Sequence, residues 1–132
     1  MRYQIDGSRF TTLEGFYEEI SRAVIPGETW GHNLDAFNDI LRGHFCTPPD
    51  GFTIVWKNHA LSKQRLGYDE TVRQLEIRLG ACHPESRDKV LGDLERARTH
   101  QGPTVFDWLV DIIRIHCRGG REEEDGVELL LD

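Results

Sequence analysis

The sequence lacks the features that would place the protein in a membrane or build it around covalent crosslinks. No apolar run approaches the roughly 20 residues that a bilayer-spanning helix needs. The three cysteines, Cys46, Cys82 and Cys117, are odd in number and have no paired spacing, which favours free thiols in a reducing compartment. The N-terminal residues carry charge where a secretory signal needs an apolar stretch. We therefore expect a cytoplasmic protein without disulfides.

Motifs that hold metals, phosphates or cofactors are also missing. The six histidines are scattered, and the nearest approaches to ligand spacing, such as His44-x-Cys46 and His116-Cys117, are single pairs. A zinc site is signalled by two such pairs. Gly119-Gly120 follows an expected helix instead of opening one, which is the reverse of a phosphate-binding loop. The sequence thus predicts no metal and no cofactor.

Positive charge is in short supply, because 23 acidic residues face 16 lysines and arginines and give a formal net charge of −7. A surface of this sign repels nucleic acid, so we expect no nucleic-acid ligand. A basic protein is the natural partner for such a surface. Acidity also keeps many proteins soluble, so the charge alone does not identify a partner.

Apolar periodicity and capping residues divide the 132 residues into alternating strands and helices. Thr12, Asn33 and Thr104 are expected helix N-caps, and Asp107 completes a capping-box pattern with Thr104. Leu79 is followed by Gly80, which we expect to end the third helix. The predicted strands and helices cover residues 3–5, 12–23, 33–41, 52–56, 62–79, 84–100, 104–118 and 127–131.

This alternation predicts a small α/β domain, residues 1–132, with a three-stranded parallel sheet flanked by helices. The middle run, Phe52–Trp56, is continuously apolar, which favours a central strand covered on both faces. The charged stretch before Thr104 is expected to form a helix on the outside. Residues 121–126 are expected to form a solvated acidic loop.

The second predicted helix separates its apolar and acidic residues. Asp35 and Asp39 fall on one side of the helical wheel, opposite Leu34, Phe37, Ile40 and Leu41. Two interpretations remain open: an ordinary solvated face, or a recognition surface that includes the loop before the helix. Trp30 in that loop is either an exposed anchor for a partner or a residue that packs beneath the loop.

Residues 30–43, Trp-Gly-His-Asn-Leu-Asp-Ala-Phe-Asn-Asp-Ile-Leu-Arg-Gly, resemble the loop and second helix of the barstar family. The family pattern is an aromatic residue, Gly, any residue, Asn-Leu-Asp-Ala, two residues, Asp, two residues and Gly. Ile5-Asp6-Gly7 and Ile54-Val55-Trp56-Lys57-Asn58 agree in order with the surrounding family elements. The resemblance covers roughly residues 3–66 and 104–131, which leaves residues 67–102 as a helical insertion.

The resemblance implies a barstar-like fold without catalytic activity, which inhibits a basic, guanyl-preferring, barnase-like microbial ribonuclease one-to-one. Inhibitors of the family insert the second helix and its preceding loop into the nuclease active site, where a carboxylate replaces an RNA phosphate. Asp39 matches that carboxylate, Asp35 its acidic neighbour and, across the insertion, Asp111 an outlying contact. The expected partner-binding residues are Thr29, Trp30, Gly31, Asn33, Asp35, Asn38, Asp39, Gly43, His44 and Asp111.

The sequence also departs from the family pattern, and two other functions compete with inhibition. Thr29 and His44 stand where the family commonly has aromatic residues, and Arg42 lies where it can partly neutralise Asp39. One rival is an enzyme that uses Asp35 and Asp39 with His32 or His44 for metal binding or acid–base chemistry. The other is a regulatory interaction module on the same fold that binds a different basic protein.

Overall fold

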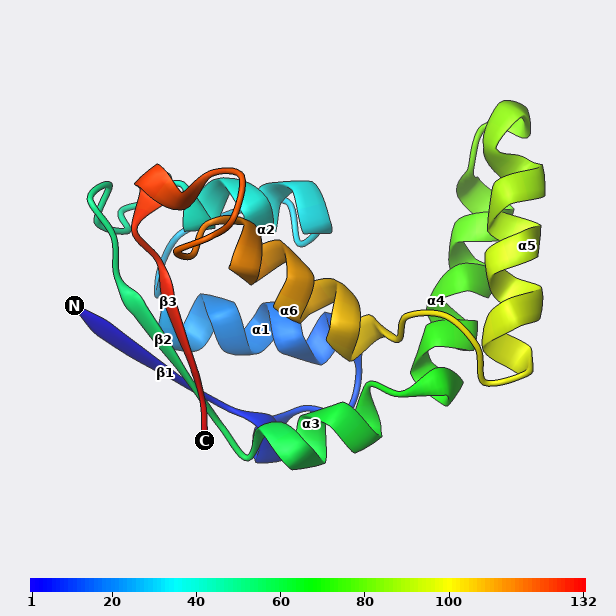
Figure 1. Ribbon diagram of the computed structural model, residues 1–132, viewed down its shortest axis with the longest axis horizontal. Helices are drawn as coiled ribbons and strands as arrows, with labels where there is room; N and C mark the ends of the chain where they lie inside the picture. Colours follow the sequence, from blue (N-terminus) through cyan, green and yellow to red (C-terminus); the bar gives the residue numbers. More distant parts are fainter.

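The computed structural model describes all residues, 1–132, and contains the predicted three-stranded parallel sheet. The strands are β1 (Arg2–Asp6), β2 (Thr53–Lys57) and β3 (Glu128–Leu131), and β2 lies between the other two (Figure 1). In the register, Ile54 of β2 lies beside Tyr3 of β1 and Leu129 of β3. The α/β class and the central position of the Phe52–Trp56 run are confirmed.

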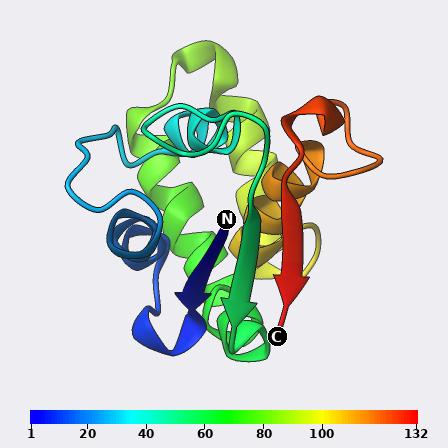
Figure 2. The ribbon, with the colours of Figure 1, turned by 90° about the vertical axis from the view of Figure 1, so that its left-hand side faces the viewer.

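Helices connect the strands and gather on one side of the sheet, so that the opposite face lies in front of them in Figure 2. None of the helices combines the length and apolar composition that crossing a membrane requires. The α-helices are α1 (Leu13–Ala23), α2 (Leu34–Leu41), α3 (His59–Arg65), α4 (Tyr68–Ala81), α5 (Arg87–Arg98) and α6 (Val105–Ile115). Short 3-10 helices occupy η1 (Gly7–Arg9), η2 (Pro84–Ser86) and η3 (Glu123–Asp125).

The expectation that both faces of β2 are covered is wrong. Ile54 and Trp56 are buried, whereas Thr53, Val55 and Lys57, on the other face, are only partly buried. An apolar residue at position 55 made the run continuous without a second layer of helices above it. The helices of the body, α2 among them, therefore lie on one side of the sheet.

The predicted helix N-caps are confirmed, because each depends on residues that lie close together in the sequence. Thr12 Oγ1 accepts a hydrogen bond from the Gly15 N–H at 3.0 Å, and Asn33 Oδ1 accepts one from the Ala36 N–H at 2.8 Å. Thr104 and Asp107 form the reciprocal capping box at the start of α6. These caps fix where α1, α2 and α6 begin.

The predicted helix from Ser62 to Leu79 is instead two helices, α3 and α4, that meet at Leu66 and Gly67. Leu66 is fully buried, and its carbonyl oxygen accepts a hydrogen bond from the Phe106 N–H of α6 at 3.1 Å. Burial of Leu66 against α6 therefore accompanies the change in helix direction. Gly80 does not end a helix, because it lies inside α4.

The main core lies between the sheet and its helices and contains 22 buried apolar residues. Trp56 is fully buried near its centre, with Phe16 and Phe106 at ring-centroid distances of 5.5 and 5.2 Å. The Trp56 indole Nε1–H donates to Ser62 Oγ at 2.9 Å, which satisfies its polar atom. The buried residues of α2, Phe37, Ile40 and Leu41, belong to this core.

A second, smaller core lies between α4 and α5, which form a hairpin that we call the helical arm (residues 68–98). Leu75, Leu94 and Ala97 are its buried residues, and Figure 1 shows the arm projecting from the body. Glu70 connects the arm to α1 by accepting a hydrogen bond from the Leu13 N–H at 2.7 Å. The prediction of a charged helix on the outside at α5 is confirmed.

Candidate functional site

Helix α2 presents its two carboxylates on the side opposite its buried residues, as its sequence predicts. Phe37, Ile40 and Leu41 are at most 1% exposed. Asp35 is exposed, and the Asp39 side chain is 43% exposed. The buried face anchors the helix in the main core, so both carboxylates are displayed on a supported surface.

The loop before α2 folds back onto α1 through Trp30, whose side chain is 8% exposed. The Trp30 indole Nε1–H donates to Ser21 Oγ at 2.6 Å, and the ring meets Tyr17 edge-on at 5.5 Å. Of the two interpretations of Trp30, the structure supports packing beneath the loop. Trp30 therefore positions the loop and does not offer an exposed aromatic surface to a partner.

Backbone conformations at both ends of α2 restrict how the helix can be joined to the body. His32, just before the N-cap, has a φ of +46°, in the left-handed region that non-glycine residues rarely adopt. Gly43, after the helix, has a φ of +96°, and a Cβ there would lie 2.6 Å from Pro49 Cα. The Thr47 hydroxyl donates to the Ile40 carbonyl at 2.8 Å. Gly43 thus has a conformational role at the end of α2.

The Arg42 guanidinium binds two carboxylates, that of Asp39 on α2 and that of Glu122 near the C-terminus. Arg42 Nη1 donates to Asp39 Oδ1 at 2.8 Å, while Nε and Nη2 donate to Glu122 Oε1 and Oε2, both at 3.1 Å. The hydrogen bond from Arg42 lowers the pKa of Glu122, and the bond to Glu122 contributes most to the raised pKa of Arg42. Glu122 is therefore ionised around neutral pH.

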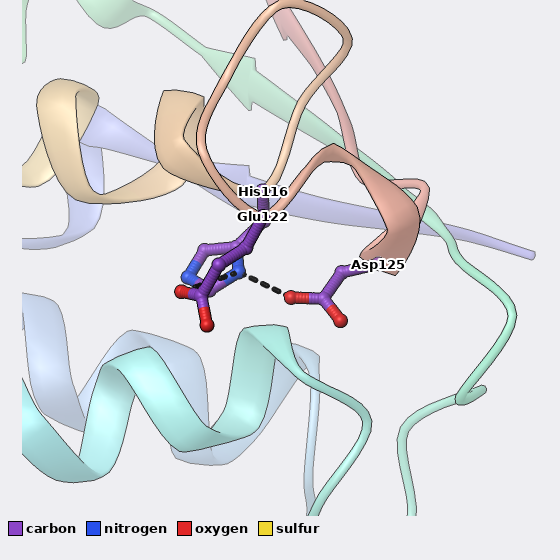
Figure 3. Close-up of side chains that lie close together, drawn as sticks. All are labelled: His116, Glu122 and Asp125. Carbon is purple, nitrogen blue, oxygen red and sulfur yellow. Dashed lines mark hydrogen bonds and ion pairs between the residues drawn. The ribbon is translucent and has the colours of Figure 1, made fainter.

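A buried histidine next to this group connects α2 to the C-terminal loop. His116 is fully buried, its Nδ1 lies 2.6 Å from Asp125 Oδ2, and its Nε2 contacts the side-chain oxygen of Asn38 on α2. Figure 3 shows the carboxylates of Glu122 and Asp125 beside the His116 ring. Nδ1 and the Asp125 carboxylate therefore lie within hydrogen-bonding distance.

These contacts correct the expectation that residues 121–126 form a simple solvated loop. Glu122 and Asp125 are partly buried and hold Arg42 and His116, although Arg121, Glu123 and Glu124 remain exposed. Glu122 is 80 residues from Arg42 in the sequence. No local pattern relates such distant residues, which is why the sequence did not identify this group.

His116, Glu122 and Asp125 also form a cluster of potential metal ligands, whose donor atoms lie within 4.8 Å of one another. Each of these side chains already has a protein partner. His116 and Asp125 contact each other, and Glu122 binds Arg42. A metal ion would have to displace both interactions. The chemistry of the cluster therefore fits a structural hydrogen-bond network between α2 and the C-terminal loop.

The remaining predicted partner-binding residues divide into exposed residues and residues that serve α2 itself. Thr29, Gly31 and His44 are exposed near Asp35 and Asp39 in the sequence. Asn33 and Asn38 direct their side chains to the backbone of α2 and to His116, respectively. These two asparagines fix the helix and its orientation.

Asp111 is exposed on α6, but it does not join the carboxylates of α2. It lines a groove beside β3, together with Arg114 and Leu129. His116, which faces α2, follows five residues later and therefore lies roughly 140° further around α6 at 100° per residue. The structure thus brings Asp35 and Asp39 together and separates Asp111 from them.

Comparison with known proteins relates this arrangement to one family. The family model described as "Barstar (barnase inhibitor)" matches residues 1–89 of the 132. The match includes β1, α1, α2, β2, α3 and α4, so it extends into the segment expected to be an insertion, and it stops before α6 and β3. No curated protein matched the chain. Because the match covers more than half of the sequence and includes the carboxylate-bearing helix, the chain belongs to the barstar family.

Proposed function

We propose that the protein inhibits a basic, guanyl-preferring, barnase-like microbial ribonuclease by covering its active site with α2 and the loop before it. The observation that carries this proposal is membership of a family described as barnase inhibitors. The exposed carboxylates of Asp35 and Asp39, on a helix fixed by the main core, support it. This proposed function requires no metal, cofactor or catalytic group, and it is that of an inhibitor instead of an enzyme.

In this mechanism Asp39 occupies the position of an RNA phosphate among the cationic groups of the nuclease. Asp35, nearer the N-terminus of α2, adds a second negative charge at the edge of the contact. The net charge of −7 attracts a basic nuclease from a distance and accelerates their encounter. Binding one-to-one in the cytoplasm would protect the cell that produces the nuclease.

The predicted contact surface contains two kinds of residue. Thr29, Gly31, Asp35, Asp39 and His44 reach the nuclease directly from the loop and from α2. Trp30, Asn33, Asn38 and Gly43 act by fixing that surface, since their side chains or backbones are engaged within the protein. Asp111 would contribute only if the nuclease reached around α6.

An inhibition assay tests the proposal. The purified protein is mixed with a panel of secreted guanyl-preferring ribonucleases, and the cleavage of a fluorescent RNA is followed. We expect inhibition of at least one nuclease, complete at one inhibitor per enzyme. A basic ribonuclease of unrelated fold serves as the control for non-specific binding of cations to an acidic protein. Failure to inhibit any member of the panel would remove the proposal.

A second candidate function is regulation of a different basic protein by the same surface. The ion pair between Arg42 and Asp39 favours this candidate, because it places a positive charge beside the expected phosphate mimic. Thr29 and His44, which replace aromatic residues of the family pattern, also change the surface. This function would lead if the protein bound a basic partner one-to-one through α2 but inhibited no ribonuclease.

A further inference from the structure

Arg42 presents a physical difficulty for recognition by Asp39. Its guanidinium lies 2.8 Å from the Asp39 carboxylate, at the C-terminal end of α2 and within the proposed contact surface. An incoming cationic site would meet a positive charge next to the carboxylate that it is expected to bind. Like charges brought together in an interface oppose association. Recognition through Asp39 therefore requires another group of the protein that fixes the position of the Arg42 guanidinium.

Glu122 has the geometry for this control. It binds Arg42 through two parallel hydrogen bonds, Nε to Oε1 and Nη2 to Oε2, whereas Asp39 receives one. Paired contacts of this kind fix the plane and direction of a guanidinium better than a single contact does. The Arg42 and Glu122 side chains are 35% and 32% exposed, so both are partly shielded from water.

The charges support the same interpretation. Asp39, Arg42 and Glu122 together carry two negative charges and one positive charge, so a negative charge remains for a partner. Without Glu122, Asp39 would be the only carboxylate bound to Arg42, and the pair would have no net charge. With Glu122 present, Arg42 keeps two hydrogen bonds even if Asp39 turns toward a cation of the nuclease.

Glu122 is itself held in place by the folded C-terminal segment. Its backbone N–H donates to the Ile115 carbonyl at 2.9 Å, and its carboxylate lies 3.8 Å from the Nδ1 of buried His116. His116 in turn contacts Asn38 on α2. Glu122 and His116 lie outside the family match, which ends at residue 89.

We propose that Glu122 is a positioning residue, which keeps the Arg42 guanidinium bound when Asp39 turns toward a cation of the nuclease and so keeps Asp39 available as the recognition carboxylate. This inference rests on the proposed function. It predicts that Arg42 opposes nuclease binding and that Glu122 counteracts it. The effect of Glu122 on binding should therefore depend on Arg42.

The binding test is a double-mutant cycle with the inhibited nuclease. Glu122→Gln should weaken inhibition roughly five-fold, the scale of a partly exposed ion pair, and Arg42→Ala should strengthen it. Glu124→Gln is the matched control, because Glu124 is an exposed residue of the same loop with no ion pair or hydrogen-bond partner. In the Arg42→Ala background, Glu122→Gln should have no more effect than Glu124→Gln. Equal effects of the two glutamine variants in the natural background would overturn the inference, as would a full Glu122→Gln effect without Arg42.

A second measurement needs no nuclease and keeps the two proposals separable. The Arg42 Nε–H should give a slowly exchanging side-chain signal in ¹⁵N NMR, which Asp39→Ala preserves and Glu122→Gln removes. Loss of the signal in Asp39→Ala instead would show that Asp39 holds Arg42, and the inference would fail. If the signal behaves as expected but no ribonuclease is inhibited, the positioning of Arg42 stands and the proposed function falls.

Discussion

Replacing Asp39 with alanine should separate inhibition from stability. In the free protein the change removes a partly exposed ion pair between residues three apart on a helix, worth about 0.3–0.5 kcal/mol. It also removes repulsion from Asp35 and introduces a better helix former, which together return a similar amount. Arg42 keeps both hydrogen bonds to Glu122. The free energy of unfolding should therefore change by no more than about 0.5 kcal/mol, or about 1–3 °C in melting temperature.

The expected effect on binding is much larger. Without Asp39, the cationic groups of the nuclease would be buried without a partner. Removing one partner of a buried charge pair costs about 2–5 kcal/mol, and complexes of this family are themselves an example of this effect. At about 1.4 kcal/mol per factor of ten, the inhibition constant should rise roughly 30- to 4000-fold. Asp35→Ala and Asp111→Ala should cost about 1 kcal/mol or less each, which is up to about five-fold.

The assay measures inhibition constants for the three variants with the same nuclease and fluorescent RNA, beside their thermal melting curves. Asp111→Ala is the matched control, because it removes an exposed helical aspartate away from α2. An Asp39→Ala protein that melts like the natural one and inhibits equally well would refute the reasoning. Recognition would then belong to another surface, and the regulatory candidate would gain support.

Three further predictions follow from charge and burial. The association rate with the nuclease should fall by roughly ten-fold or more between low and physiological salt in stopped-flow mixing, and a flat rate would exclude electrostatic steering. Serine at Cys46, Cys82 or Cys117 should leave the inhibition constant unchanged in any variant that remains folded, because Cys46 is an exposed free thiol and burial raises the pKa of Cys117. Burial alone would raise the pKa of Glu19, but hydrogen bonds from Arg22 and the Asp6 N–H outweigh it and lower this pKa from 4.5. Its contribution to stability is therefore complete above pH 4.5 and is lost as the pH falls, so Glu19→Gln should flatten the acid side of a plot of melting temperature against pH.

The parts of the fold that the sequence predicted are those set by neighbouring residues. Thr12, Asn33 and Thr104 cap helices through side chains that reach only three residues along the chain. The acidic side of α2 follows from helical periodicity alone. The longest and most specific part of the family resemblance, residues 30–43, includes this same helix.

The parts that the sequence did not predict depend on distant contacts. The break between α3 and α4 coincides with contact between Leu66 and Phe106 of α6. Glu122 was expected to be solvated. Its contact with Arg42, 80 residues away, and the burial of His116 leave no pattern among neighbouring residues. The open face of β2 was missed because Val55 is apolar without being fully covered.

The separate core of the helical arm bears on how the molecule unfolds. Leu75, Leu94 and Ala97 pack with one another, and the partly buried Trp108 contacts both this cluster and the main core. So small a cluster should open at a lower free energy than the body, and the amide hydrogens of α5 should exchange with solvent before those of β2. Because α2 packs in the main core, such local opening leaves the inhibitory surface folded. The turn between α4 and α5, residues 82–86, is thus the place where the chain can carry a fluorophore or a fused peptide at least cost to α2.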